Sequence, residues 1–302
     1  MCSVSRDAVY VRAMALDGPS CPSGRVAALP VTAGCAAPSP RWGSLQSGRM
    51  SDLIPVAEGP AYRAPSIVAL AKDAPTLNEL LVFTSEAELR VDALRMRITH
   101  TLATSRGDDV ETVEVTVRHP GHAKVVRRHN TQPMSRDYDV WITDGELVKT
   151  YDAGSNRASI RPLRRGVVGA DGPDLPAFAR LVMPRSPLPA ESIAEAFVHP
   201  HGYARNVLVT GDLTLVGTAD VHGREAFILR ADHPRSAFVL TDRPDHWIEV
   251  GIDRMTGFLL LLVEHIGDHV SQHAEVTSLE IDPLVGDEAF ELHLSSDVRM
   301  LY

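Results

Sequence analysis

Two stretches of the chain share one pattern: VWITDGELVKTY at residues 140–151 and WIEVGIDRMTGFLL at residues 247–260. In each, runs rich in β-branched and aromatic residues flank a short turn that contains Asp and Gly. Gly accepts a positive φ and Asp tolerates one, so Asp and Gly between apolar runs predict a β-hairpin. The second turn is longer and ends at Gly257, which is typical of a longer hairpin loop. Both stretches therefore predict antiparallel sheet.

Alternation of apolar and polar residues extends this prediction along the chain. From residue 94 to 102, and again from 112 to 118, every second residue is polar, which is typical of strands with one wet and one dry face. The dry set includes Leu94, Met96, Ile98, His100 and Leu102. Further strands are predicted at residues 123–128, 138–143, 147–151, 157–162, 212–219, 224–231, 246–252, 257–265, 273–281 and 289–294.

Helices are predicted to be few. Thr76-Leu-Asn-Glu79 is a capping box, and Ser85-Glu-Ala-Glu88 repeats it, so the sequence predicts helical structure from Thr76 to about Val91. Residues 164–190 are rich in Gly and Pro, and they interrupt the strands. Short helices are expected at residues 176–182 and 189–198. Short connections between the strands favour an α+β, β-rich fold with one antiparallel sheet.

Composition divides the chain into two parts. Residues 1–62 are rich in Ala, Pro, Gly, Ser and Arg without a sustained period, so we expect a disordered leader. Residues 26–35 resemble a lipoprotein signal, but Pro30 interrupts them and they lie far from Met1. Met50 is an alternative start. Residues 63–302 are expected to form a single domain, with a mixed helix and loop insert at about 164–200.

Charge and cysteine content exclude several protein classes. The net charge is −9, while residues 1–50 alone carry +3, so the remainder is strongly acidic. A nucleic-acid binder would need a basic face, so none is predicted. All three cysteines, Cys2, Cys21 and Cys35, lie in the leader, so the predicted domain has no disulfide. No apolar stretch is long enough for a transmembrane helix.

The sequence gives little support for catalysis. No nucleophile elbow, P-loop, dinucleotide fingerprint or zinc-protease motif occurs, and no cofactor is predicted. His199 and His201 are weak candidates for a metal site, but a polar loop is the favoured interpretation because Pro200 lies between them. The histidines of residues 265–273 have helical spacing, yet Gly267 and the flanking β-rich runs indicate a hairpin tip instead.

Several motifs together resemble one family, and they occur in its order along residues 75–295. They are Val117-Arg-His-Pro120, Trp141-Ile-Thr-Asp144-Gly145 with Tyr151, Gly217 before Gly223-Arg224-Glu-Ala-Phe-Ile-Leu, Ile252-Asp253-Arg-Met-Thr256-Gly257-Phe-Leu, Glu275-Val-Thr277 and Asp287-Glu-Ala-Phe290. In this order the chain resembles the LolA-like lipoprotein-carrier superfamily. The resemblance implies a strongly curved, antiparallel half-barrel of about 11–12 strands, with a few helices covering its concave face.

The resemblance also implies a class of function. Relatives carry lipoproteins or glycolipids through the bacterial envelope, or sense lipids and bind an anti-sigma partner, and none is an enzyme by its fold. The chain departs from that pattern in two ways. Without a convincing export signal it is cytoplasmic as encoded, and an envelope location follows only if the family resemblance holds and the start differs. Aromatic residues make up only 5% of the chain, so any cavity would be aliphatic.

The leading hypothesis is a non-enzymatic carrier or sensor of an acyl-chain ligand or lipoprotein. Five consecutive apolar residues at 259–263 predict a strand covered on both faces, by core or by an apolar cavity. The candidate cavity lining is Leu94, Met96, Ile98, Val113, Val115, Leu259 and Leu261, and the candidate lid is Phe178, Leu181 and Phe197. Two alternatives stay open: a regulatory module of the same fold that binds a protein partner, and a metal-assisted hydrolase using His199 and His201.

Overall fold

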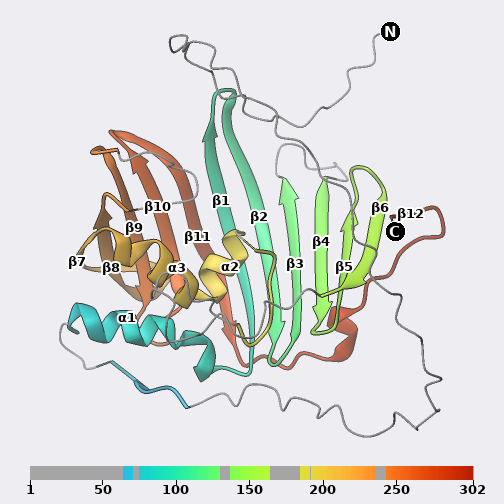
Figure 1. Ribbon diagram of the computed structural model, residues 1–302, viewed down its shortest axis with the longest axis horizontal. Coiled ribbons are helices and arrows are strands. Elements are labelled where there is room, and N and C mark those ends of the chain that lie inside the picture. Colours follow the sequence, from blue (N-terminus) through green and yellow to red (C-terminus); the bar gives the residue numbers. More distant parts are fainter. Residues whose placement is uncertain are drawn as a thin grey trace, which may run out of the picture. The chain divides into compact units, whose positions relative to one another are not determined.

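Both predicted Asp/Gly turns join neighbouring antiparallel strands in the computed structural model (Figure 1). Strands β4 (Tyr138–Asp144) and β5 (Leu147–Asp152) flank the first turn, and β9 (His246–Asp253) and β10 (Leu259–Ile266) flank the second. Gly257 has a φ of +82°, and a Cβ there would lie 2.9 Å from the Phe83 carbonyl oxygen. A larger residue would strain the backbone and collide with it, so glycine fixes this turn.

The structure describes residues 64–70, 75–129, 137–163, 184–190, 192–234 and 243–301. The remaining described strands are β1 (Ala93–Thr104), β2 (Gly107–Arg118), β3 (His122–His129), β6 (Arg157–Pro162), β7 (Asp212–Val221), β8 (Arg224–Asp232), β11 (His269–Ile281) and β12 (Arg299–Leu301). Residues 1–62, where a disordered leader is expected, and the candidate lid residues Phe178 and Leu181 lie outside the described residues.

The strands form one sheet of twelve, in the order β12-β6-β5-β4-β3-β2-β1-β11-β10-β9-β8-β7. Every neighbouring pair is antiparallel except β12 and β6, which are parallel. Strand β1 pairs with both β2 and β11, so segments from the start and the end of the domain meet in the middle of the sheet. The sheet is open, with β12 and β7 at its edges. The predicted fold class is confirmed.

The helices α1, α2 and α3 are short, and they lie on one face of the sheet (Figure 1). Helix α1 (Leu77–Ser85) begins after the predicted capping box of Thr76 and Glu79, and the 3-10 helix η1 (Ala87–Arg90) continues it. Helices α2 (Ile193–Val198) and α3 (Pro200–Asn206) follow one another, and η3 (Leu208–Thr210) leads into β7. None of the described helices is long and apolar enough to cross a membrane.

The main core lies between these helices and the concave face of the sheet. Leu80 of α1, Phe197 of α2 and Leu208 of η3 are fully buried there against strand residues such as Leu229 and Val250. Burial of a side chain of this size contributes roughly 1.5–3 kcal/mol. The run at residues 259–263 is buried except for Leu261, which is half-buried, so both faces of β10 are covered as predicted.

Two local predictions were wrong. Residues 289–294 do not form a strand: Asp287–Phe290 is the 3-10 helix η4, and Phe290 packs on Val126, Val140 and Ile142 on the opposite face of the sheet. Residues 199–201 do not form a polar loop, because Pro200 occupies the first turn of α3 and is buried. Proline has no N–H to lose at that position, so it begins a helix instead of breaking one.

Candidate ligand-binding cavity

A cavity of about 1080 Å³ lies between the concave face of the sheet and the helices α2 and α3. Strands β1 to β5 supply one wall together with β10 and β11, and residues 192–207 supply the other. The cavity thus begins where the packed core ends. Its volume is slightly above the range typical of small-molecule sites, which is about 300–1,000 Å³.

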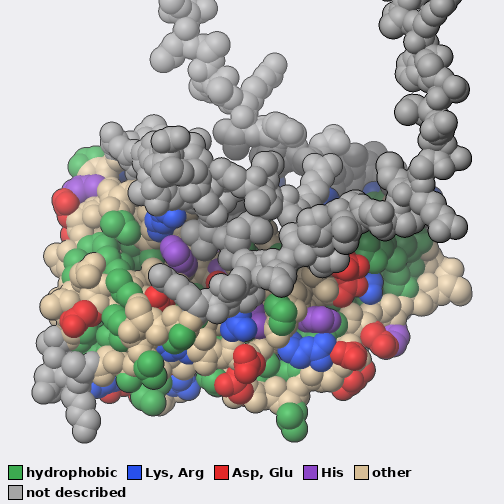
Figure 2. Space-filling view, turned by 60° about the horizontal axis from the view of Figure 1, so that its bottom comes forward, with side chains coloured by type: hydrophobic (Ala, Val, Ile, Leu, Met, Phe, Trp, Pro, Cys, Tyr) green, Lys and Arg blue, Asp and Glu red, His purple; other side chains and the backbone are tan. Residues whose placement is uncertain are grey.

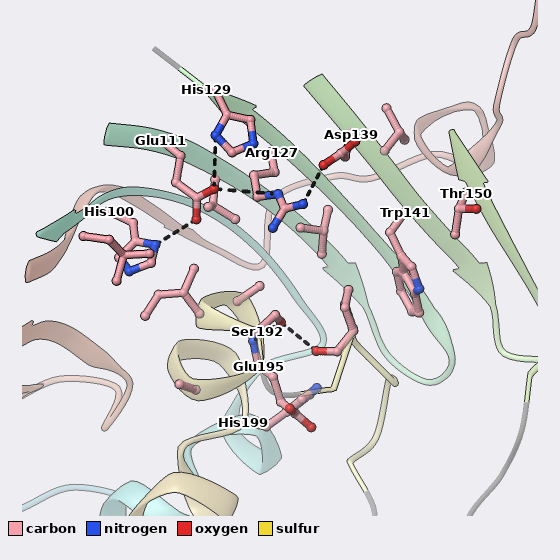
Figure 3. A pocket seen from close by; sticks show the side chains of 18 of the residues that line it. His100, Glu111, Arg127, His129, Asp139, Trp141, Thr150, Ser192, Glu195 and His199 are labelled. Atoms are coloured by element: carbon pink, nitrogen blue, oxygen red, sulfur yellow. Dashed lines mark hydrogen bonds and ion pairs between the residues drawn. The ribbon is translucent and has the colours of Figure 1, made fainter. Parts of the chain in front are cut away.

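One part of the cavity surface is apolar. Val113 and Val125 line it from β2 and β3, Leu262 lines it from β10, and Ile193 faces it from α2. Trp141 of β4 is half-buried and also lines the cavity, and Figure 3 shows it on the sheet wall opposite the helices. These side chains offer a surface for an aliphatic chain.

The other part is a polar row that crosses seven consecutive strands, from β9 to β4. We call it the polar ladder, and it consists of His246, Glu264, Gln272, His100, Glu111, Arg127 and Asp139. All of its members except His246 line the cavity. His246 is buried, and its Nε2 lies 2.8 Å from Glu264 Oε1.

The centre of the polar ladder is a hydrogen-bonded chain of buried side chains. His100 Nδ1 lies 2.7 Å from Glu111 Oε1, and Gln272 Nε2 lies 3.0 Å from His100 Nε2. With His100 neutral, its Nδ1–H donates to the carboxylate while its Nε2 accepts from the amide. Both bonds then point toward Glu111 and strengthen one another. Burial alone would raise the pKa of Glu111, but the hydrogen bond from His100 and the electrostatic contributions of neighbours such as Arg127 together outweigh it, so that pKa is lowered.

Arg127 connects Glu111 to the next strand. Its Nη2 donates to Asp139 Oδ2 at 2.6 Å, and its Nε lies 3.7 Å from Glu111 Oε2 (Figure 3). Burial lowers the pKa of Arg127, but the bond to Asp139 and the surrounding carboxylates raise it by more. His129 Nδ1 lies 4.0 Å from the same Oε2 and 3.9 Å from Asp109 Oδ1. The guanidinium is therefore enclosed by acidic groups.

A second buried polar set lies beneath the helices. His199 Nδ1 is 2.8 Å from Glu88 Oε2, its Nε2 is 2.6 Å from the Ser186 carbonyl oxygen, and Ser186 Oγ is 2.9 Å from His119 Nδ1. Arg185 donates to the carbonyl oxygens of Glu88 and Val91. We call these residues the sealed set; it consists of Glu88, His119, Arg185, Ser186 and His199. It ties the segment 184–190 and helix α2 to η1.

Burial is the largest single influence on the pKa values of His119 and Glu88 in the sealed set. It lowers the pKa of His119 to about 4, assisted by the charges of Arg185 and His199 and opposed by that of Glu88. Burial would raise the pKa of Glu88, but the bond with His199, the charges of His199 and His119 and the bond from Arg185 together outweigh it and lower that pKa. The set is thus held with Glu88 ionised and His119 neutral near pH 7.

The predicted lining residues are distributed between cavity and core. Val113 lines the cavity. The other six, Leu94, Met96, Ile98, Val115, Leu259 and Leu261, belong to the main core or pack against it, and the cavity lining does not include them. Phe197 of the predicted lid is fully buried in that core on α2. Contact of these residues with a ligand stays a prediction.

The two candidate metal ligands, His199 and His201, have different surroundings. Both ring nitrogens of His199 are within hydrogen-bonding distance of protein oxygens, and the side chain is buried. His201 is the second residue of α3 and is half-buried. Within the described ranges, no group of three or more His, Cys, Asp or Glu side chains is arranged to hold a metal ion.

The polar ladder was missed at the level of sequence, although two of its members carried a signal. His100 interrupts the apolar row of β1, and Glu111 interrupts the row that continues as Val113, Val115 and Val117. A polar residue in the dry row of a strand needs a partner, and adjacent interruptions in paired strands indicate one another. Gln272 could not be found in this way, since it is 172 residues from His100.

Figure 2 shows acidic and basic side chains interspersed over the described surface that faces the viewer, rather than gathered into areas of one charge.

Comparisons with known proteins give matches only among solved structures. Neither the protein-family models nor the curated proteins contain a match. MucB, whose complex with MucA from Pseudomonas aeruginosa has also been solved, matches at 15% identity and a TM-score of 0.40, over 72% of this chain and 62% of that one. The matched region therefore spans less than two thirds of MucB.

Two further structures are similar over most of their own length. LprF from Mycobacterium bovis matches at 12% identity and a TM-score of 0.36, over 70% of this chain and 96% of that one. A LolA superfamily protein from Nitrosomonas europaea matches at 10% identity and a TM-score of 0.30, over 72% of this chain and 99% of that one.

Proposed function

We propose that this protein is a non-enzymatic binding protein that holds the chain of an amphipathic, acyl-type ligand in the cavity beside α2 and α3. The observation that carries the proposal is the cavity itself, about 1080 Å³ with an apolar wall of Val113, Val125 and Leu262. Apolar walls with a few convergent polar groups are the usual composition of small-molecule sites. A carrier or a sensor would use the same cavity.

Burial of the apolar part of the ligand provides the favourable free energy for such binding. Removing about 300 Å² of apolar ligand surface from water contributes roughly 7 kcal/mol before association costs, at about 25 cal/mol per Å². Subtracting those costs leaves a net binding free energy smaller in magnitude than about 7 kcal/mol, so we expect an affinity weaker than micromolar. A ligand of this kind binds reversibly, as carriage or sensing requires.

The proposal is tested with the purified chain and one defined probe. Native mass spectrometry shows whether a lipid co-purifies, and calorimetry with dodecyl glucoside measures binding of a neutral alkyl chain. Ala196→Trp places a bulky ring on the half-buried α2 surface that lines the cavity, so it should reduce dodecyl glucoside affinity at least tenfold. Val216→Trp is the matched control because Val216 is 61% exposed on β7.

Two outcomes would contradict this function. If no lipid co-purifies and dodecyl glucoside does not bind, the proposal fails, provided that thermal unfolding shows the protein to be folded. Equal effects of Ala196→Trp and Val216→Trp would move the binding site away from the cavity.

A regulatory module with a protein partner is the alternative that we keep. MucB has been solved in complex with MucA, which is a property of MucB. A pull-down that recovers one stoichiometric partner, with no lipid in the purified protein, would favour the alternative. The envelope location is also a proposal, and fractionation of cells that express the chain tests it.

A further inference from the structure

The charges on the cavity wall are unbalanced. Among the described lining residues there are six carboxylates, Asp109, Glu111, Asp139, Asp152, Glu195 and Glu264, against two guanidinium groups, Arg127 and Arg157. The lining histidines do not reverse this balance while they are neutral. The wall therefore presents a negative potential to whatever enters the cavity, and the surrounding apolar residues reduce its screening.

Glu111 is the best-placed acceptor in this wall. It is 9% exposed, and its Oε1 is bonded by His100 at 2.7 Å. Its Oε2 lies 3.7 Å from Arg127 Nε and 4.0 Å from His129 Nδ1, which is beyond hydrogen-bonding distance in both cases. That oxygen keeps lone pairs for a donor in the cavity, and a buried ionised acceptor forms strong bonds with charged donors.

Arg127 is poorly placed to bind an anion. Its Nη2 is bonded to Asp139 at 2.6 Å, and Glu111 lies on its other side. A ligand carboxylate would have to approach the guanidinium between two carboxylates of the protein (Figure 3). Like charges at such distances disfavour binding, so the cavity discriminates against anions even though it contains an arginine.

We propose that the polar end of the ligand is a cation of the alkylammonium type, which Glu111 binds through Oε2, and that the cavity rejects the carboxylate of a free fatty acid. The inference rests on the proposed function, because it uses the same cavity and adds the chemical class of the polar end. The alkyl chain lies along Val113, Val125 and Leu262, and the ammonium group donates to the polar ladder.

Three probes of equal chain length separate the two proposals. Dodecylammonium, dodecanoate and dodecyl glucoside are each titrated into the full chain by calorimetry, below their micelle concentrations and at pH 7.5. We expect dodecylammonium to bind at least about tenfold tighter than dodecanoate, with the preference decreasing as salt is added. If none of the three binds, the proposed function fails; if dodecyl glucoside binds and dodecanoate equals or exceeds dodecylammonium, only this inference is overturned.

Variants then locate the selectivity. Glu111→Gln should reduce the preference for dodecylammonium about tenfold, since it removes the central charge. Glu114→Gln is the matched control: Glu114 is on the same strand, points to the opposite face and pairs with Arg97 at 3.0 Å. Asp139→Asn is a second test that leaves the bond of His100 to Glu111 intact, and it should reduce the preference severalfold. An unchanged preference in both Glu111→Gln and Asp139→Asn would overturn the inference.

Discussion

Strands β7 to β11 and strands β2 to β6 present the same concave face to different neighbours. Over β8 and β9 the face is filled, because helix residues such as Phe197 and Leu208 belong to the same core as Leu229 and Val250. Toward β2 to β5 the face borders the cavity, and charged residues of the polar ladder replace aliphatic ones. The alternation of strand residues is similar in both halves, so the covering helices decide which part becomes core.

Two buried His–Glu pairs also differ between the core and the cavity. His199 and Glu88 are 2.8 Å apart under the helices, and the histidine's other nitrogen is held by Ser186. His100 and Glu111 are 2.7 Å apart at the cavity, and one carboxylate oxygen there remains available. We infer that the first pair serves stability and the second serves binding.

Phe197→Ala should have the largest effect on stability. Phe197 is fully buried between α2 and the filled half of the sheet, so truncation leaves a cavity in the core. We expect the free energy of unfolding to fall by about 3–5 kcal/mol, measured by urea denaturation. Val216→Ala, at an exposed position on β7, should change it by less than about 0.5 kcal/mol. A small effect of Phe197→Ala would mean that this half is not tightly packed.

Acid should destabilise the protein through His119 before the carboxylates protonate. Its pKa is about 4 in the folded state, below the ordinary value of 6.5, so the unfolded chain binds the proton first. Stability is therefore complete above about pH 6.5 and is lost as pH falls to about 4, by up to roughly 3 kcal/mol. Urea denaturation at several pH values checks this. His119→Gln should flatten that part of the profile, and an unchanged profile in this variant would contradict the assignment.

Substitution of Gly257 in its turn should lower the free energy of unfolding. Gly257→Ala forces a Cβ to within 2.9 Å of the Phe83 carbonyl oxygen at a φ of +82°. We expect a loss of about 1–3 kcal/mol in the free energy of unfolding. Gly202→Ala in α3 is a suitable control, since a Cβ there meets no atom within 4 Å, and it should be neutral or stabilising. Equal effects of both substitutions would show that the turn is not the constraint we infer.

Substitution of Trp141 at the cavity wall should lower the free energy of unfolding only slightly. Trp141 is half-buried beside the cavity, so Trp141→Phe removes fewer packed contacts than a core substitution does. We expect less than about 1.5 kcal/mol in the free energy of unfolding but a measurable loss of dodecyl glucoside affinity. Phe227→Leu, in the filled half where Phe227 is 3% exposed, should show the reverse: lower stability and unchanged affinity.

The sequence predicted the sheet well because its signals are local. Asp144-Gly145 and the turn that ends at Gly257 fix hairpins within a few residues, and the capping box of Thr76 and Glu79 fixes the start of α1. The prediction from local sequence failed at Pro200, because a proline can either begin a helix or interrupt a strand. It also failed at 289–294, where packing of Phe290 decides the conformation.

The site was predictable only in part. The concave apolar face was expected, but which of its residues border the cavity depends on where α2 and α3 end, and no local pattern encodes that. Of the seven expected lining residues, Val113 borders the cavity, and the other six lie in or against the core. The polar ladder depends on pairing between distant strands, as with His100 and Gln272.

The contrast between the open and the filled half can be measured directly with the chain's own tryptophans. Trp141 borders the cavity, whereas Trp247 stacks on His265 at 3.5 Å and lies under Arg230 on the opposite face of the filled half. Trp42 lies outside the described residues and is replaced by Phe. Two single-tryptophan proteins follow, W42F/W247F and W42F/W141F, and each is titrated with a dodecyl amphiphile brominated in its chain. We expect saturable quenching of Trp141 fluorescence and no quenching of Trp247 fluorescence. Quenching of Trp247 alone, or of both equally, would contradict this expectation.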